Sequence, residues 1–245
     1  MDGCNYAGPV QILQVVLSML SWFRPLLLFP CVLLSIGPAL GQISVPQAAI
    51  VCESKDLIEE PACKTKLKGM FARDGDALTI NLDGGKAKKY IGNRAACEAD
   101  NVEKCLVFRI ERYFPQIRSY LITKGYYEGA DYLLVSQRTG SETIVSDSLT
   151  LSPNAKFLIA IDQNDAGERD FDIAIWSMGS DPPKQEFKYK ADRYENWEIT
   201  AWKDDTNINV KAWVNDKTSF DQEAKLVRMD KGWTLVLGKK TDRPQ

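Results

Sequence analysis

The sequence predicts an antiparallel all-β protein made of short strands and tight turns. Two observations support this fold class. From Leu67 onward apolar and polar residues alternate in short runs, which is the period of a β-strand. Glycine, proline, asparagine and aspartate cluster between these runs, as they do in turns. We therefore expect about twelve strands, joined mostly by hairpins, and no long helix.

Residues 1–41 are predicted to be a secretory signal peptide. Arg24 supplies the basic region, and about twelve mainly apolar residues follow it. Ala39 and Gly41 place small residues three positions and one position before an expected cleavage site, so the mature chain should begin at Gln42. This interpretation predicts an exported protein that is periplasmic or extracellular.

A membrane anchor is the alternative to a cleaved signal. The apolar stretch contains Arg24, Pro25 and Pro30, whereas a spanning helix needs about 20 predominantly apolar residues. We therefore favour cleavage and expect no stable membrane span afterwards. A start at Met19 instead of Met1 would give a signal of more ordinary length.

Four cysteines remain in the mature chain, and an even number in an oxidising compartment favours two disulfides. These residues are Cys52, Cys63, Cys97 and Cys105. Four cysteines allow three connectivities, of which we favour Cys52–Cys63 and Cys97–Cys105 because each pair is close in sequence. Their spacings are wider than those of structural zinc sites, so no metal or other cofactor is expected.

The mature chain is expected to have one folded domain. Residues 42–66 are predicted to be an irregular arm pinned by a disulfide, in which Ser54 caps a helical turn that Pro61 ends. Residues 67–245 show no linker that would separate a second domain, and they should form a single all-β unit.

The predicted strands follow the alternating runs in order. They are residues 78–82, 105–112, 131–136, 141–145, 156–161, 171–176, 185–189, 197–202, 207–214, 226–229 and 233–237. Gly140 stands at the bulge position of the loop between the third and fourth of these runs, which predicts a β-hairpin.

Phe157 and Trp197 each open a predicted hairpin and lie forty residues apart, and Tyr120 lies 37 residues before Phe157. Such a period is typical of the blades of a β-propeller. Residues 149–160 read Leu-Thr-Leu-Ser-Pro-Asn-Ala-Lys-Phe-Leu-Ile-Ala. This segment resembles the opening strand of TolB-type and WD-type β-propeller blades, which usually read Ser-Pro-Asp-Gly-Lys before apolar residues.

Residues 132–140 are similar to the closing hairpin of a preceding blade, so the resemblance covers residues 132–160. Asn154 and Ala155 stand where the family has Asp-Gly. The resemblance implies a propeller-like fold, for which the mature chain has room for about five small blades, and a binding platform without catalytic residues. A β-sandwich or a barrel of the same hairpins is the alternative.

Composition excludes several classes of function. The 245 residues contain no His, which excludes a Ser-His-Asp triad, a Cys-His dyad and an imidazole-bound zinc. The formal net charge of −2 disfavours nucleic-acid binding. We therefore expect an exported, non-catalytic binding or interaction protein whose partner is an unidentified protein or glycan.

Two alternatives remain open. One is a His-free carbohydrate hydrolase with a pair of carboxylates, for which Glu128, Asp131, Asp204 and Asp205 are among the candidates. Nothing in the sequence indicates that any two of them face each other. The other is a structural subunit of an envelope assembly.

Trp202 and Trp213 are the candidate ligand-binding residues. Each falls out of phase with the apolar residues of its own strand, and they flank the loop at residues 203–206. Two such indoles could form an exposed platform for a sugar or a peptide. In the alternative interpretation, both faces of the sheet are covered and the indoles belong to the core.

Overall fold

The computed structural model describes residues 49–52, 61–162, 170–191, 195–214 and 220–242. The predicted signal peptide, its cleavage site at Gln42 and the helical turn predicted at Ser54 lie outside these residues. The described chain forms four antiparallel sheets, and its two α-helices have five and six residues. The prediction of an antiparallel all-β protein is confirmed. Among the described residues no helix is long and apolar enough to cross a membrane.

The first sheet is a three-stranded meander. Its strands are β2 (Phe71–Asp74), β3 (Ala77–Asn81) and β4 (Ala87–Ile91). The short helix α1 (Pro61–Lys66) precedes it, and a second helix, α2 (Arg94–Glu98), follows it. Pro61 begins a helix, and the turn that it was predicted to end lies outside the described residues. Proline suits this position because the first helical turn does not need its missing N–H.

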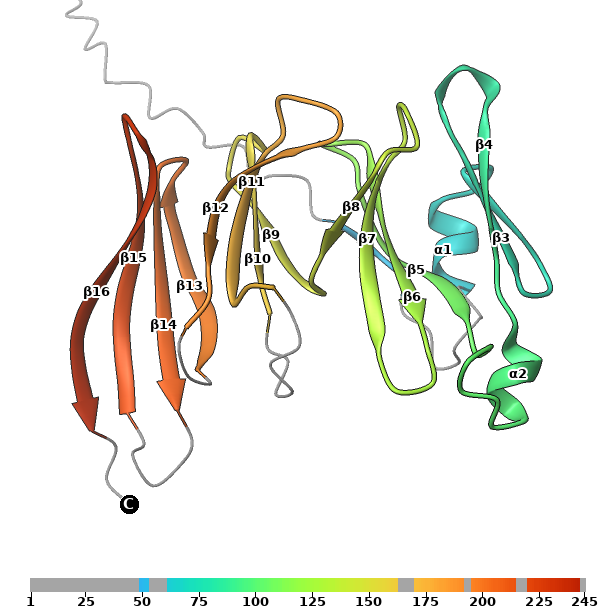
Figure 1. The fold of residues 1–245 in the computed structure, drawn as a ribbon. Helices are drawn as coiled ribbons and strands as arrows, with labels where there is room; N and C mark the ends of the chain where they lie inside the picture. Colours follow the sequence, from blue (N-terminus) through green and yellow to red (C-terminus); the bar gives the residue numbers. More distant parts are fainter. Residues whose placement is uncertain (1–48, 53–60, 163–169, 192–194, 215–219, 243–245) are drawn as a thin grey trace, which may run out of the picture. The chain divides into compact units, whose positions relative to one another are not determined.

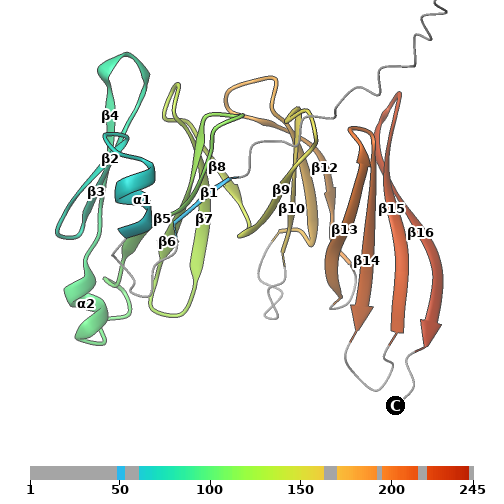
Figure 2. The ribbon, with the colours of Figure 1, turned by 180° about the vertical axis from the view of Figure 1, so that it is seen from behind.

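The second sheet has five strands in the order β1-β5-β6-β7-β8. Their bounds are β1 (Ile50–Val51), β5 (Val107–Phe114), β6 (Ser119–Gly125), β7 (Ala130–Ser136) and β8 (Glu142–Val145). Strand β1, from the predicted irregular arm, pairs with β5 (Figure 2). The Cys52–Cys63 disulfide follows β1 and joins it to α1, with a Cα–Cα distance of 5.0 Å.

The third and fourth sheets each have four strands. The third contains β9 (Ser148–Leu151), β10 (Phe157–Ile161), β11 (Ile173–Ser177) and β12 (Lys184–Tyr189). The fourth contains β13 (Asn196–Asp204), β14 (Asn207–Val214), β15 (Phe220–Met229) and β16 (Gly232–Asp242). Figure 1 colours the chain from blue at its beginning to red at its end, and the fourth sheet is drawn in orange and red.

Three apolar cores join each sheet to the next one along the chain. Strand β6 explains this arrangement, because Tyr120 and Ile122 face the core shared with the first sheet while Leu121 faces the core shared with the third. Strand β10 is likewise buried on both faces, through Ile159 toward the fourth sheet and Leu158 toward the second. Serial packing of antiparallel meanders is a propeller-like arrangement. The described residues form four sheets, where about five blades were predicted.

The segment that resembles propeller blades lies at the junction of two sheets. Residues 132–140 end β7 and form its hairpin with β8, which closes the second sheet, and residues 149–160 open the third. Gly140 has a φ of 76°, as the predicted hairpin bulge requires. The resemblance to WD-type blades therefore corresponds to real strand boundaries.

Candidate functional site

A cavity of about 680 Å³ lies over the second sheet, on the face that Leu121 and Leu134 share with the core toward the third sheet. Its floor consists of two rows of side chains that cross β5, β6 and β7. The rows are Val107, Gly125 and Ala130, and then Arg109, Thr123 and Tyr132. Residues of one row are paired across adjacent strands, so the floor has a fixed register.

The first row of the floor, which contains Val107, Gly125 and Ala130, is made of small side chains. A Cβ atom added at Gly125 would lie 2.8 Å from Cγ2 of Val107, which is too close without a shift. Glycine therefore lets the side chain of Val107 lie directly against the backbone of β6. Gly129, in the turn that follows, would place a Cβ in open space.

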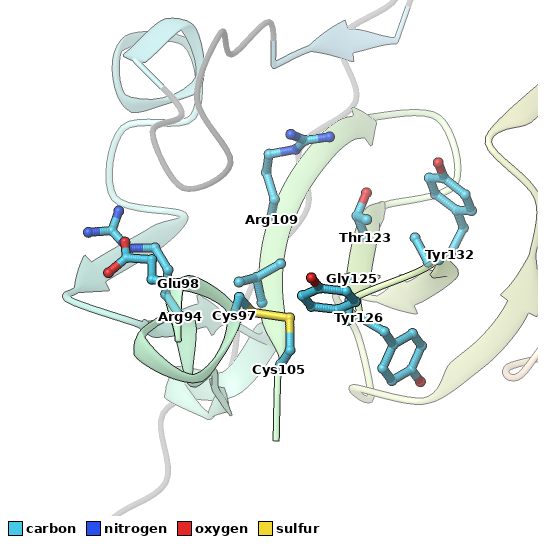
Figure 3. Close-up of a pocket in the computed structure, with 13 residues that line it drawn as sticks. Arg94, Cys97, Glu98, Cys105, Arg109, Thr123, Gly125, Tyr126 and Tyr132 are labelled. Atoms are coloured by element: carbon cyan, nitrogen blue, oxygen red, sulfur yellow. A yellow bond between two sulfur atoms is a disulfide. The ribbon is translucent and has the colours of Figure 1, made fainter. Parts of the chain in front are cut away.

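The cavity has two walls, and Figure 3 shows residues of both. One wall comprises α2 and the Cys97–Cys105 disulfide, whose Cα atoms are 4.4 Å apart. The other is the turn between β6 and β7, which carries Tyr126 and Tyr127. Both disulfides have the predicted pairing.

A hydrogen bond connects the two walls. The hydroxyl of Tyr127 donates to Oδ1 of Asp100 at 3.0 Å, and Asp100 lies inside the loop that the Cys97–Cys105 disulfide closes. Asn93 anchors the base of this loop, because its side chain accepts a hydrogen bond from the backbone N–H of Ala96 and caps α2. The separation of the walls is therefore set by a covalent and a hydrogen-bonded link.

Tyr126 is held in one orientation. Its hydroxyl donates to Oδ2 of Asp131 at 2.7 Å, and Nζ of Lys124 lies 5.3 Å from the centre of its ring. The interaction with the Tyr126 hydroxyl raises the pKa of Lys124, so the cation is kept. Tyr126 nevertheless remains 40% exposed as a residue, and Tyr127 is 41% exposed.

The arginines of the cavity have carboxylate partners. Nε of Arg109 donates to Oε1 of Glu111 at 2.8 Å, and the hydroxyl of Thr123 donates to the same oxygen. Arg94 forms an ion pair with Glu98 at 3.0 Å across one turn of α2. The charged side chains that line the cavity thus occur in balanced pairs.

The two tryptophans proposed as a platform lie on opposite faces of the fourth sheet. Trp213 lies on the face opposite Ile208, Val210 and Ala212, in agreement with the alternation of β14. Trp202 pairs with Ile208 and packs in the core, where its ring centre is 6.4 Å from that of Trp233. The structure does not bring Trp202 and Trp213 together.

A bulge explains the position of Trp202. The register of β13 with β14 shifts between Ile199 and Ala201, so Thr200 is an extra residue. The shift turns Ala201 away from the core and Trp202 toward it, the reverse of the expected phase. Ligand binding by Trp202 or Trp213 stays a prediction.

The carboxylates considered for hydrolysis lie at two separate places, Glu128 and Asp131 near the turn between β6 and β7, and Asp204 and Asp205 near the turn between β13 and β14. Asp131 accepts a hydrogen bond from Tyr126, and Asp205 accepts one from the backbone N–H of Asn154 at 3.2 Å. Hydrogen bonds from Thr206 and Asn207 lower the pKa of Asp204. These contacts place Asp131 beside the cavity and the other two in the turn between β13 and β14.

Two further carboxylates with shifted pKa values lie between sheets. Burial raises the pKa of Glu142, but hydrogen bonds from Lys88 and Tyr90 outweigh this effect and leave it below its ordinary value. Burial also raises the pKa of Asp181, but hydrogen bonds donated by Ser136 and Ser141 outweigh burial and leave this pKa below its ordinary value. In the described part of the chain no group of three or more Cys, Asp or Glu residues could hold a metal ion.

Comparison with known proteins gives little beyond this description. No protein family matches the sequence, and no curated protein matches it either. Among solved structures, the WD40 domain of SCAP from fission yeast is similar, with a TM-score of 0.30 and 12% identity. The match covers 56% of this chain and 34% of that one, so it spans about a third of the other chain's length.

Sequence reasoning missed the cavity. The run at residues 119–125 was not assigned as a strand, so the turn that carries Tyr126 and Tyr127 was not recognised as a hairpin. The available signal was the adjacent pair of tyrosines beside Gly129, between two runs rich in apolar residues. Arg109 and Thr123 come together only through cross-strand pairing.

Proposed function

We propose that this protein is an exported, non-catalytic interaction protein that binds its partner in the cavity over β5, β6 and β7. The observation that carries the proposal is a cavity of about 680 Å³ with exposed, oriented tyrosine rings at its rim. Its volume is in the range of small-ligand sites. Tyrosine is favoured at binding surfaces because one end of the side chain is apolar and the other is polar.

The disulfides support export. Cys52–Cys63 and Cys97–Cys105 are both formed, and such bonds persist mainly in oxidising compartments. Residues 1–41 have the composition of a secretory signal, which agrees with this location. The periplasm or the extracellular space is therefore the proposed site of action.

The carboxylates favour binding over hydrolysis. A glycosidase needs a carboxylic acid with a raised pKa beside a second carboxylate. Glu142, Asp181 and Asp204 instead have pKa values below their ordinary range. Glu98, which lines the cavity, forms an ion pair with Arg94.

The proposal can be tested by affinity capture. The purified protein is immobilised and exposed to envelope and extracellular extracts, and the retained proteins and glycans are identified by mass spectrometry. We expect a component that the wild type retains and that a Tyr126→Ala/Tyr127→Ala double variant loses. The control is Ile144→Ala on β8, which changes an exposed apolar side chain outside the cavity.

Two results would contradict the proposal. Equal retention by the double variant, with its circular dichroism spectrum and melting temperature unchanged, would place binding elsewhere on the protein. Chemical conversion of the retained component during the incubation would show an enzyme.

A further inference from the structure

We infer that the ligand of this cavity is a neutral saccharide of one or two sugar rings. This inference rests on the proposed function, because it names the ligand class of the same site. Three features of the cavity carry it: its balanced charges, the fully paired strand at the centre of its floor, and the exposure of its tyrosines.

Charge balance favours an uncharged ligand. Glu111 engages Nε and Nη2 of Arg109, and Glu98 engages Nε of Arg94. The side chain of Arg109 is 25% exposed and that of Glu111 is 21% exposed, so this pair is largely shielded from water. An anionic ligand would compete with Glu111, and a cationic one with Arg109. A neutral polar ligand can use the Nη1 donors of Arg109 without breaking the pair.

The floor favours a compact ligand over an extended peptide. Peptides that bind by strand addition need a sheet edge with free backbone groups. Here β6, at the centre of the floor, pairs with β5 and with β7 over its whole length. Strand β1 pairs with β5 at Arg112 and Tyr113, outside the floor, and β8 pairs with β7 at residues 132–135. The centre of the floor therefore presents side chains only.

The rim favours a ligand with an apolar face. The hydroxyls of Tyr126 and Tyr127 already donate to Asp131 and Asp100, so the exposed parts available to a ligand are the ring surfaces. A pyranose ring has a face of C–H groups that packs on such a surface and an edge of hydroxyls that hydrogen bond. Tyrosines fixed in this way lose little side-chain entropy on binding.

The test is a glycan array followed by titration calorimetry on the purified protein. The array contains neutral mono- and disaccharides, including glucose, cellobiose, chitobiose, maltose and lactose, with glucuronic acid and glucosamine as charged counterparts. Uncharged tetrapeptides are measured in parallel. We expect a neutral saccharide to bind, with Tyr126→Ala and Tyr127→Ala each weakening its affinity about tenfold.

Matched variants separate stacking from folding. Tyr126→Phe keeps the ring but loses the hydrogen bond to Asp131, so it should weaken binding less than Tyr126→Ala does, and Ile144→Ala should leave affinity unchanged. Absence of binding to every neutral saccharide overturns the inference. If a peptide or a charged sugar binds in a ring-dependent manner instead, the proposed interaction function stands and only the ligand class fails. If nothing that binds depends on Tyr126 or Tyr127, both proposals fail.

Discussion

Ala155 has a left-handed backbone conformation, with a φ of 56°, in the turn between β9 and β10. Backbone N–H groups in this turn have hydrogen-bond partners. The Asn154 side chain accepts a hydrogen bond from the backbone N–H of Lys156 at 2.9 Å, and the hydroxyl of Ser152 accepts one from that of Phe157 at 3.1 Å. A Cβ atom is unfavourable at this φ, and the blades that this segment resembles have glycine there.

We therefore expect Ala155→Gly to raise the free energy of unfolding by about 0.5–1 kcal/mol, because relief of the left-handed strain exceeds the added chain entropy. Urea unfolding measures this change. Ala99→Gly is the matched control, because Ala99 has a φ of −95° and glycine there should destabilise the protein. Destabilisation by both substitutions would contradict the account of the turn.

Two single residues show what the sequence could and could not predict. Gly140 could be placed in its hairpin because a positive φ is a local property that glycine signals. The face occupied by Trp202 could not, because the bulge at Thr200 depends on pairing with β14. A one-residue shift exchanges the two faces of a strand, so alternation alone fails beyond a bulge.

At the scale of elements, Asp181 connects two sheets. It lies in the link between β11 and β12, and its carboxylate accepts hydrogen bonds from Ser136 at 2.6 Å and from Ser141, which flank the β7–β8 hairpin loop. The Asp181 side chain is only 13% exposed. Burial raises its pKa, but these hydrogen bonds outweigh burial and leave the pKa below its ordinary value.

A lowered pKa in the folded state gives a defined pH dependence. The ionised Asp181 stabilises the folded protein above its unfolded pKa of about 3.9, and this contribution is lost as the pH falls through the lower folded pKa. We expect Asp181→Asn to lower the free energy of unfolding at pH 7 by about 1–3 kcal/mol, with the difference narrowing below about pH 4.

Denaturant unfolding of both proteins between pH 3 and pH 7 measures this difference. Asp170→Asn serves as the control, because the Asp170 side chain is 92% exposed and should contribute little at any pH. A difference that is constant across the range would contradict the role assigned to the Asp181 charge.

Strands that are buried along most of their length were the easiest to predict from the sequence. Strands such as β10 and β11 are buried over most of their length because sheets pack on both faces, and their continuous apolar runs were easy to recognise. Strand β6 reads Ser-Tyr-Leu-Ile-Thr-Lys-Gly and was missed, although Tyr120, Leu121 and Ile122 are fully buried. Its polar Thr-Lys-Gly end does not alternate with apolar residues, so the strand period is short. The burial of Tyr120 comes from the first sheet, since its hydroxyl donates to the backbone oxygens of Met70 and Asn81.

At the scale of the whole molecule, serial packing makes each inner sheet part of two cores. The sequence predicted this all-β, propeller-like class through strand period and turn spacing, because both are local. It did not predict the number of sheets or the position of the cavity. The number of sheets depends on how many strands join each meander, and the position of the cavity depends on which face of a sheet is left uncovered.

The proposed export of the protein predicts a mature chain of defined length with both disulfides formed. Intact-mass analysis of the protein isolated from its native compartment should give a chain that begins at Gln42. Alkylation without a reducing agent should find Cys52, Cys63, Cys97 and Cys105 unmodified. A chain that retains residues 1–41, or that has free thiols, would contradict export.

The central claim is that the cavity over β5, β6 and β7 is the binding site. Amide hydrogen–deuterium exchange, with and without the captured component, tests this claim most directly. We predict slower exchange on binding at residues 94–109 and 123–132, which form the walls and the floor. Protection confined to residues 196–214, which carry Trp202 and Trp213, with no change around the cavity would contradict it.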